Sequence, residues 1–392
     1  MQVQQIYEIL NDITGEVIGD TELLQEDLSN IVDVGNELFD AQSVDNYVKT
    51  LTDHIGRVVF VNRQYNVSVP SILRDAWEYG SVLEKITIGL PTATANESWS
   101  LTDGTSYDPN VFTAPTVTVK FYNSKVTFEV PMSFADRQVK ESFSNLTQLN
   151  AFFSAIETAI YKSMSIKVES LIMRTINYLM AETVLDEYSG GTGLGDSSGV
   201  RAVNLLYLYN QQYPNAQLTV AQAKLNPDFI RFASYQMALY SDRMRKVSTL
   251  FNVGGTDKFT PSDMQHFVML SEFGQAANVY LQSDTFHEEF TKLPNAEMVT
   301  YWQGSGTDYG FEDTSAINIE LADDKSLSMS GILGVIFDHD ACGVCNANQR
   351  ITSYYNAKAE FTNQWFKSDG SYFVDLNENC IVFFIADPTN NG

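Results

Sequence analysis

Four residues near the carboxyl end have side chains that could bind a metal ion. His339, Cys342 and Cys345 lie in one short segment, and Cys380 follows further along the chain. Histidine and cysteine are the ligands of structural zinc sites, and the Cys-x-x-Cys spacing also occurs in redox motifs. An apolar run before the segment predicts a strand, in which residues 342 and 345 would face opposite sides unless Gly343 makes a turn. We expect buried packing residues here, with zinc binding and redox chemistry as the alternatives.

Two pairs of adjacent acids have the composition of general acid–base groups. Glu288 and Glu289 follow His287, and Asp323 precedes Asp324. Paired carboxyl groups transfer protons when their environments separate their pKa values, but adjacent acids on a surface are ordinarily solvated. We therefore expect no catalytic role for either pair.

Other catalytic patterns are absent from the sequence. The glycines at positions 191, 193 and 195 form neither of the phosphate-binding glycine patterns. The histidines at positions 54, 266, 287 and 339 have no spacing that supports a Ser-His or Cys-His site. The sequence predicts no catalytic residue, no cofactor and no metal, and therefore a protein that is not an enzyme.

Composition limits the partners. The chain has 392 residues, with 24 Lys and Arg against 49 Asp and Glu, a formal net charge of −25. Nucleic acids and anionic membranes attract clustered cations, so this charge argues against both. No apolar run reaches the roughly 20 residues of a membrane span, since the longest, Cys380–Ala386, has strand length. The amino terminus resembles no signal segment and three cysteines are too few for a disulfide scaffold, so we expect a cytoplasmic product.

One very long helix is the clearest predicted element. The stretch from Met132 to Ser189 contains neither Gly nor Pro, and apolar residues recur there at steps of three and four. This pattern predicts an amphipathic helix over about Leu146–Val184, roughly 58 Å long and capped by Ser144 or Asn145. Such a length is typical of the backbone of an elongated molecule.

A long polar excursion interrupts a β-rich region. Short strands are predicted at Ile86–Ile88, Thr116–Phe121 and Lys125–Val130. Pro91–Pro115 is polar and carries the isolated aromatic residues Trp99, Tyr107 and Phe112. Hairpin loops usually have about 2–5 residues, so this segment is either disordered or a projecting functional loop. Its aromatic side chains either pack against their own domain or anchor another subunit.

The remaining segments predict an α+β fold. Residues 1–45 hold eleven acids and no Lys or Arg, with apolar residues at helical spacing, which indicates short helices with an acidic face. Further helices are predicted at Pro227–Val247 and Phe273–Phe290. Strands are predicted at His266–Leu270, Met298–Trp302, Ile317–Leu321 and Gly334–Phe337. Ile351–Phe366 and Ser371–Ala386 predict a hairpin with its turn at Lys367–Gly370.

The order of these segments resembles that of the major capsid proteins of tailed bacteriophages, which have the Hong Kong 97 fold. An acidic arm, a β excursion, one very long helix, a mixed α/β unit and returning strands cover nearly the whole chain. Three segments are similar to ones in members from phages of Gram-positive hosts, namely Asp53–Val59, Trp77–Ile86 and Phe337–Gly343. Phe337–Gly343 corresponds to a strand in that family, which favours the interpretation that the cysteines are packing residues and not metal ligands.

The resemblance implies an α+β Hong Kong 97-type capsid fold with five regions. They are an N-terminal arm (1–81), an extended β-loop that lies across the neighbouring subunit (82–132), a peripheral domain with the spine helix (133–189), an axial domain (190–334) and the C-terminal strands of the peripheral domain (335–392). Trp99, Tyr107 and Phe112 then become candidate inter-subunit contacts.

The function implied by the resemblance is that of a major capsid protein. Such a protein self-assembles through hexamers and pentamers into the icosahedral shell of a virion, in the host cytoplasm. The shell has a portal at one vertex and encloses double-stranded DNA without sequence-specific contact. The first 80 residues are too short for a fused scaffolding domain, so a separate scaffolding protein is expected. Residues 91–118 contain no lysine, so the isopeptide cross-link of some members is not expected.

Two other functions remain as alternatives. One is an encapsulin-like cargo compartment with the same fold. The other is a zinc-dependent enzyme that uses His339, Cys342, Cys345 and Cys380.

Overall fold

The computed structural model describes residues 70–74, 83–110, 112–135, 137, 146–188, 191–282, 296–302, 314–321 and 325–388. Several expectations lie outside these residues. They are the acidic helices of residues 1–45, the segment Asp53–Val59, most of Trp77–Ile86, the caps Ser144 and Asn145, and the acid pairs Glu288–Glu289 and Asp323–Asp324.

Helix α5 (Leu146–Glu187) is the longest of the described elements and confirms the predicted long helix. Its 42 residues extend over roughly 63 Å. Ile172, Ile176 and Leu179 are completely buried at the predicted spacing, and so are Ala181 and Thr183. The carboxyl-terminal half is therefore enclosed on more than one side, which the expectation of an amphipathic helix did not include.

A five-stranded mixed sheet, the central sheet, packs against α5. Its strand order is β5 (Ala202–Asn204), β13 (Cys380–Phe384), β10 (Ile332–Asp338), β6 (Gln265–Leu270) and β7 (Ala296–Val299). Both β10 and β13 are buried along their whole length, because both faces of the sheet are covered. Val335 and Phe337 face the α5 core, while Leu333 and Ile336 face the helices on the opposite side.

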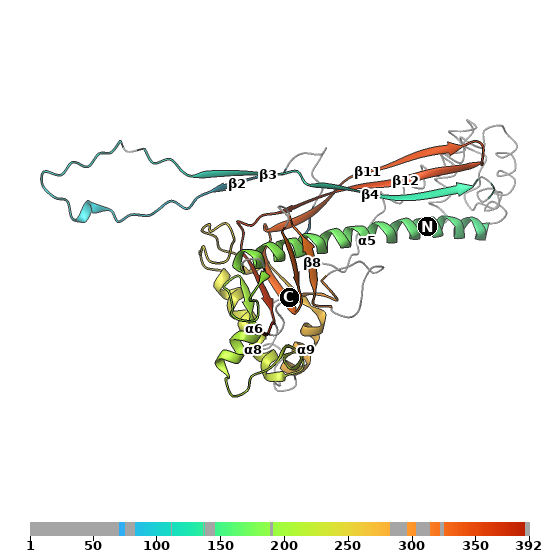
Figure 1. Cartoon of the computed structure of the whole chain (residues 1–392). Helices are drawn as coiled ribbons and strands as arrows, with labels where there is room; N and C mark the ends of the chain where they lie inside the picture. Colours follow the sequence, from blue (N-terminus) through green and yellow to red (C-terminus); the bar gives the residue numbers. More distant parts are fainter. Residues whose placement is uncertain are drawn as a thin grey trace.

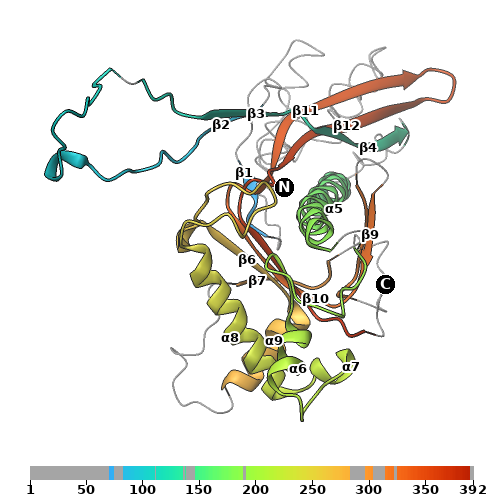
Figure 2. The same ribbon diagram turned by 60° about the vertical axis from the view of Figure 1, so that its left-hand side comes forward.

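Three helices, α6 (Leu205–Gln212), α8 (Pro227–Met244) and α9 (Ser271–Gln282), cover that opposite face. Helix α8 begins where Asn226 accepts hydrogen bonds from the backbone of Asp228 and Phe229, with Pro227 as its first residue. The short helix α7 (Val220–Ala223) follows α6 in the chain. Figure 2 shows this helical layer below the central sheet and α5 nearly end-on above it.

A second sheet, the outer sheet, lies along α5 on the side away from the central sheet (Figures 1 and 2). Its order is β1 (Leu73–Arg74), β11 (Cys342–Asn356), β12 (Phe361–Val374) and β4 (Lys125–Ala135). The predicted hairpin of Ile351–Phe366 with Ser371–Ala386 is wrong, because the structure instead pairs β11 with β12. Asn356 accepts hydrogen bonds from the backbone of Lys358 and Ala359, and Glu360 has a φ of 50°, so the chain turns there.

The segment Lys367–Gly370 continues as strand instead of turning. It pairs with β11 on one side and with β4 on the other, so its backbone groups are satisfied by the sheet. Gly370 lies against the side chain of Leu171, where a Cβ atom would be 3.0 Å from Leu171 Cδ2. Gly370 therefore permits a close approach of β12 to α5, and β13 belongs to the central sheet.

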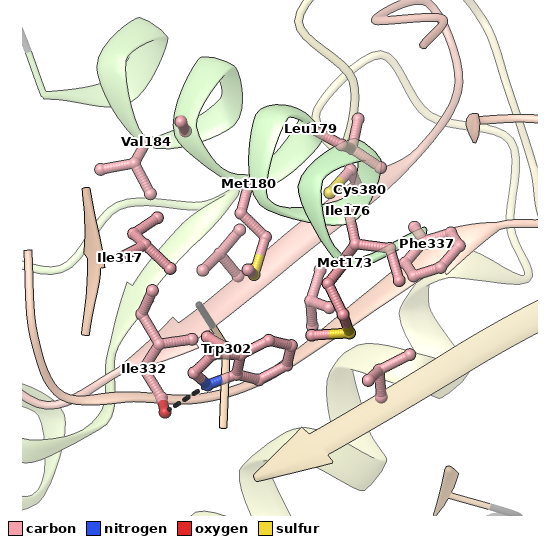
Figure 3. Close-up of a cluster of buried hydrophobic side chains, with 14 of the residues drawn as sticks. Met173, Ile176, Leu179, Met180, Val184, Trp302, Ile317, Ile332, Phe337 and Cys380 are labelled. Carbon is pink, nitrogen blue, oxygen red and sulfur yellow. Dashed lines mark hydrogen bonds between the residues drawn. The ribbon is translucent and has the colours of Figure 1, made fainter. Parts of the chain in front are cut away.

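The core around α5 is closed by Trp302 and by the hairpin of β8 (Ile317–Glu320) and β9 (Ser326–Met329). The predicted strand Met298–Trp302 is shorter than expected, because β7 ends at Val299. Trp302 is completely buried and its Nε1 donates to the carbonyl of Ile332 at 3.0 Å (Figure 3).

Strands β2 (Leu83–Ile88) and β3 (Val117–Tyr122) form a separate two-stranded antiparallel ribbon, the loop ribbon. The ribbon and the chain between its strands project from the body (Figures 1 and 2). At Asn123 and Ser124 the chain passes from this ribbon to the outer sheet. The expected region boundaries at 132/133 and 334/335 fall inside β4 and β10, respectively.

Candidate inter-subunit surface

One face of the loop ribbon is apolar and exposed. Ile86 lies opposite Val119 and Ile88 opposite Val117, so these side chains share one face, together with Phe121. Their exposed fractions range from 42% to 66%. A soluble monomer rarely exposes a contiguous apolar patch of this kind without a binding role. We call these five residues the apolar ribbon face.

The chain between the ribbon strands extends this apolar surface. Trp99 is 98% exposed, Phe112 is 87% exposed and Tyr107 is 43% exposed. Tyr107 accepts a hydrogen bond from the backbone of Thr102 at 3.1 Å, which is a contact within the excursion itself. The rings of Trp99 and Phe112 therefore do not pack against the body of the subunit in this structure.

The opposite face of the loop ribbon is cationic and docks on the body. Lys85 and Lys120 lie directly across from each other on β2 and β3. Lys85 Nζ donates to Asp375 Oδ2 at 2.7 Å and Lys120 Nζ donates to Asp375 Oδ1 at 2.8 Å. Each lysine therefore binds its own oxygen of one carboxylate, and that carboxylate is only 2% exposed.

A second carboxylate joins this cluster. Glu378 Oε1 accepts from Lys85 at 2.6 Å and from Lys258 at 2.7 Å. Lys85 also donates to the carbonyl of Asp340 at 3.2 Å. The cluster therefore links the loop ribbon to two other parts of the chain, and we call its acidic members, Asp375 and Glu378, the carboxylate pair.

The electrostatics of the cluster favour the charged forms of Asp375 and Lys85. Burial alone would raise the pKa of Asp375, but the hydrogen bonds from Lys120 and Lys85 lower it to about 2. Burial alone would lower the pKa of Lys85, but Asp375 and Glu378 raise it above its ordinary value. Burial and the nearby Asp375 charge raise the pKa of Tyr122, so its phenol stays protonated.

The four candidate metal ligands are placed apart in the fold. Cys342 and Cys345 lie at the start of β11 in the outer sheet, whereas Cys380 begins β13 in the central sheet. All three thiols are buried, and burial raises the pKa of Cys380 to about 12, which disfavours the thiolate needed for metal binding. Among the described residues, no group of three or more potential ligands is placed to hold a metal ion.

In the zinc alternative, His339 would bind a metal ion together with the three cysteines, but in the structure its side chain contacts another histidine. Its Nδ1 lies 2.8 Å from Nε2 of His266, and the two rings stack at a centroid distance of 5.1 Å. His266 in turn stacks on Phe337.

Of the glycines considered for phosphate binding, Gly195 packs against the backbone of Asp387, where a Cβ would be 2.2 Å from the carbonyl oxygen. This contact is structural.

Sequence reasoning identified the aromatic residues of the excursion but missed the apolar ribbon face and the lysine cluster. The period-two alternation at Thr116–Phe121 was visible, and it could have indicated a ribbon with one apolar face. The partners of Lys85 had no such signal, because Asp375 lies 290 residues away in the chain.

A search of solved structures matches the chain to phage capsids at low sequence identity. The capsid structure of Staphylococcus phage Andhra has a TM-score of 0.48 and 10% identity, covering 83% of this chain and 87% of that chain. The capsid of cyanophage P-SCSP1u has a TM-score of 0.44 and 10% identity, with coverages of 83% and 88%. A structure of Mycobacterium phage Che8 has a TM-score of 0.38 and 12% identity, with coverages of 80% and 89%.

No curated protein sequence matches the chain. None of the described helices is long and apolar enough to cross a lipid bilayer. The family profile of the Phi29-like phage major capsid protein matches residues 6–384, nearly the whole sequence. The chain therefore belongs to the family of Phi29-like phage major capsid proteins.

Proposed function

We propose that each copy of this capsid protein binds its neighbour in the shell through the apolar ribbon face and the aromatic residues Trp99, Tyr107 and Phe112. The observation that carries the proposal is the exposure of these apolar side chains on a segment that projects from the body. Formation of the capsid shell, the role of the family, requires large contacts between subunits and no catalytic group. Burial of exposed aromatic rings is the main source of energy in such contacts.

Each region of the chain would then have its own role in assembly. Residues 82–132 supply the extended β-loop, and residues 1–81 an arm. Helix α5 with the outer sheet supplies the peripheral domain, and residues 190–334 an axial domain around the five-fold and six-fold positions. Strands β10 and β13 lie in the same sheet as β5, β6 and β7, which supports a tight connection between the peripheral domain and the axial domain.

The same proposal includes partners other than the chain itself. A separate scaffolding protein would guide assembly into hexamers and pentamers, and a portal would occupy one vertex. The packaged DNA would meet the shell without sequence-specific contact. A net charge of −25 per copy supports this, because like charges repel within a Debye length of about 8 Å at physiological ionic strength.

Replacement of residues 90–115 by Asn-Gly tests the proposal. Gly89 N already donates to the carbonyl of Thr116 at 2.7 Å, so a two-residue turn closes the ribbon without strain. We expect a folded monomer that forms no shells, with or without the scaffolding protein of the same virus, in sedimentation and negative-stain microscopy. The matched control is a Gly/Ser segment of the original length, which should fail in the same way. Normal shells from either variant would refute the proposed contact.

A further inference from the structure

The loop ribbon holds two positive charges close together, and a carboxylate outside the ribbon neutralises them. Lys85 and Lys120 are directly opposite neighbours on its two strands, and like charges in that position destabilise a sheet. A two-stranded ribbon is also marginally stable by itself in water. Both difficulties disappear when Asp375 places one oxygen against each lysine. The docked ribbon is therefore favoured over one that swings free of the body.

The carboxylate pair sits on a firmly held turn, the junction turn (residues 375–379), which connects β12 to β13. The amide of Asp375 donates to the carbonyl of Ala341 at 2.7 Å, and the amide of Asn377 donates to Asp375 Oδ1 at 3.1 Å. The carboxylate that binds both lysines is thus oriented by a backbone contact with Ala341, just before β11, and by a contact within its own turn.

The chain between α8 and β6 holds the same turn from the other side. Gly254 N donates to the carbonyl of Leu376 at 3.0 Å, and Thr256 Oγ1 donates to the carbonyl of Asn377 at 2.9 Å. A Cβ on Gly254 would lie 1.9 Å from Asn377 Oδ1, so any other residue at this position would have to displace the Asn377 side chain. Lys258, from the same segment, is the residue that shares Glu378 with Lys85.

We propose that Lys85, Lys120 and the carboxylate pair are positioning residues that set the direction in which the extended loop leaves the body, and that Glu378 ties this direction to the α8–β6 segment through Lys258. The inference deepens the proposed function and rests on it, since the direction matters for assembly only if the loop binds a neighbour. Three of the chain's 24 cationic residues converge on these two carboxylates, in a protein with a large acidic excess.

A small rotation at the base of the loop produces a large displacement at its tip. Trp99 follows Lys85 by fourteen residues, which span at most roughly 46 Å when extended. An added angular freedom of about 10° at the base would displace the ring by up to about 8 Å at that reach. This displacement is about twice the separation of two carbon atoms in contact, so a loose base would spread the loop tip over many positions.

Distance measurements on the unassembled full-length chain test the proposal. Spin labels at Ser100→Cys and Lys246→Cys report the position of the loop relative to α8, and the three native cysteines are buried and remain unlabelled. We expect a narrow distance distribution in the parent and a clearly broader one in Lys85→Met and Asp375→Asn. Lys85→Arg should restore the narrow distribution, because it keeps the charge.

Two further variants keep the test decisive. Lys120→Met is the milder change if Asp375→Asn fails to fold, since Lys120 is partly exposed and Asp375 keeps Lys85 as a partner. Lys367→Met is the matched control, because it removes a lysine paired with Glu129 on the outer sheet. Hydrogen exchange in α5 should stay close to that of the parent in Lys120→Met and Lys367→Met, which separates positioning from general stability.

The outcomes distinguish the two proposals. Narrow distributions in folded Lys85→Met and Lys120→Met would overturn the positioning role, whatever the loop replacement does to assembly. Broad distributions would support it even if the loop replacement still formed shells, a result that would refute the proposed contact instead. With both correct, the lysine variants should give shells of mixed size or open sheets by electron microscopy.

Discussion

Trp99→Ser should weaken assembly strongly while leaving the monomer unchanged. The ring is 98% exposed, so the isolated subunit loses almost no contact and its stability should change by no more than about 0.5 kcal/mol. A tryptophan buries about 150–250 Å² when it is enclosed, worth about 4–6 kcal/mol at about 25 cal/mol per Å². Partial enclosure and ordering costs reduce this, so we expect a loss of about 2–5 kcal/mol per subunit contact.

The assay measures the lowest protein concentration at which shells form, as detected by light scattering and sedimentation. A loss of about 2–5 kcal/mol per contact corresponds to a roughly 30-fold to several-thousand-fold higher threshold, because each 1.4 kcal/mol is a factor of ten. Trp99→Phe should recover most of the effect, since it keeps an aromatic ring. An unchanged threshold for Trp99→Ser would refute the contact, and so would a melting temperature lowered by several degrees, which would place the ring inside its own subunit.

Two other predictions concern the body of the subunit. Asp375 has a pKa of about 2, below its ordinary 3.8, so it contributes about 2 kcal/mol of stability that is present above pH 4 and is lost as the pH falls toward 2. The difference in urea stability between the parent and Asp375→Asn should accordingly be constant from pH 5 to 8 and shrink on acidification, and a difference that grows in acid would contradict the charge assignment. Leu179→Ala removes a completely buried side chain of α5 and should cost about 2–5 kcal/mol in the same measurement, whereas Leu101→Ala on the exposed excursion should cost almost nothing.

Local patterns predicted the elements that local forces determine. The steps of three and four apolar residues, with no Gly or Pro, located α5 to within a few residues of its ends. Alternating residues located β3, and the polar composition of residues 91–115 included a projecting loop as one of two alternatives, which is the arrangement seen in Figure 1. The family confirms the resemblance to tailed-phage capsid proteins and the α+β fold of Hong Kong 97 type, and it favours the virion shell over the cargo compartment and the zinc-dependent enzyme.

Features that depend on distant contacts could not be predicted in this way. The segment Lys367–Gly370 has the composition of a turn, yet two neighbouring strands hold it extended against α5. The role of Lys85 depends on Asp375 and Glu378, which are close only after β12 and β13 have joined different sheets. Each of these residues looks like an ordinary surface charge in the sequence.

A cryo-electron microscopy reconstruction of the assembled shell tests the central claim most directly. We predict that residues 83–122 lie across the adjacent subunit, with the apolar ribbon face and Trp99 enclosed by it and Lys85 still bound to Asp375. A reconstruction in which these side chains face solvent, or in which the loop folds back onto its own subunit, would contradict the account.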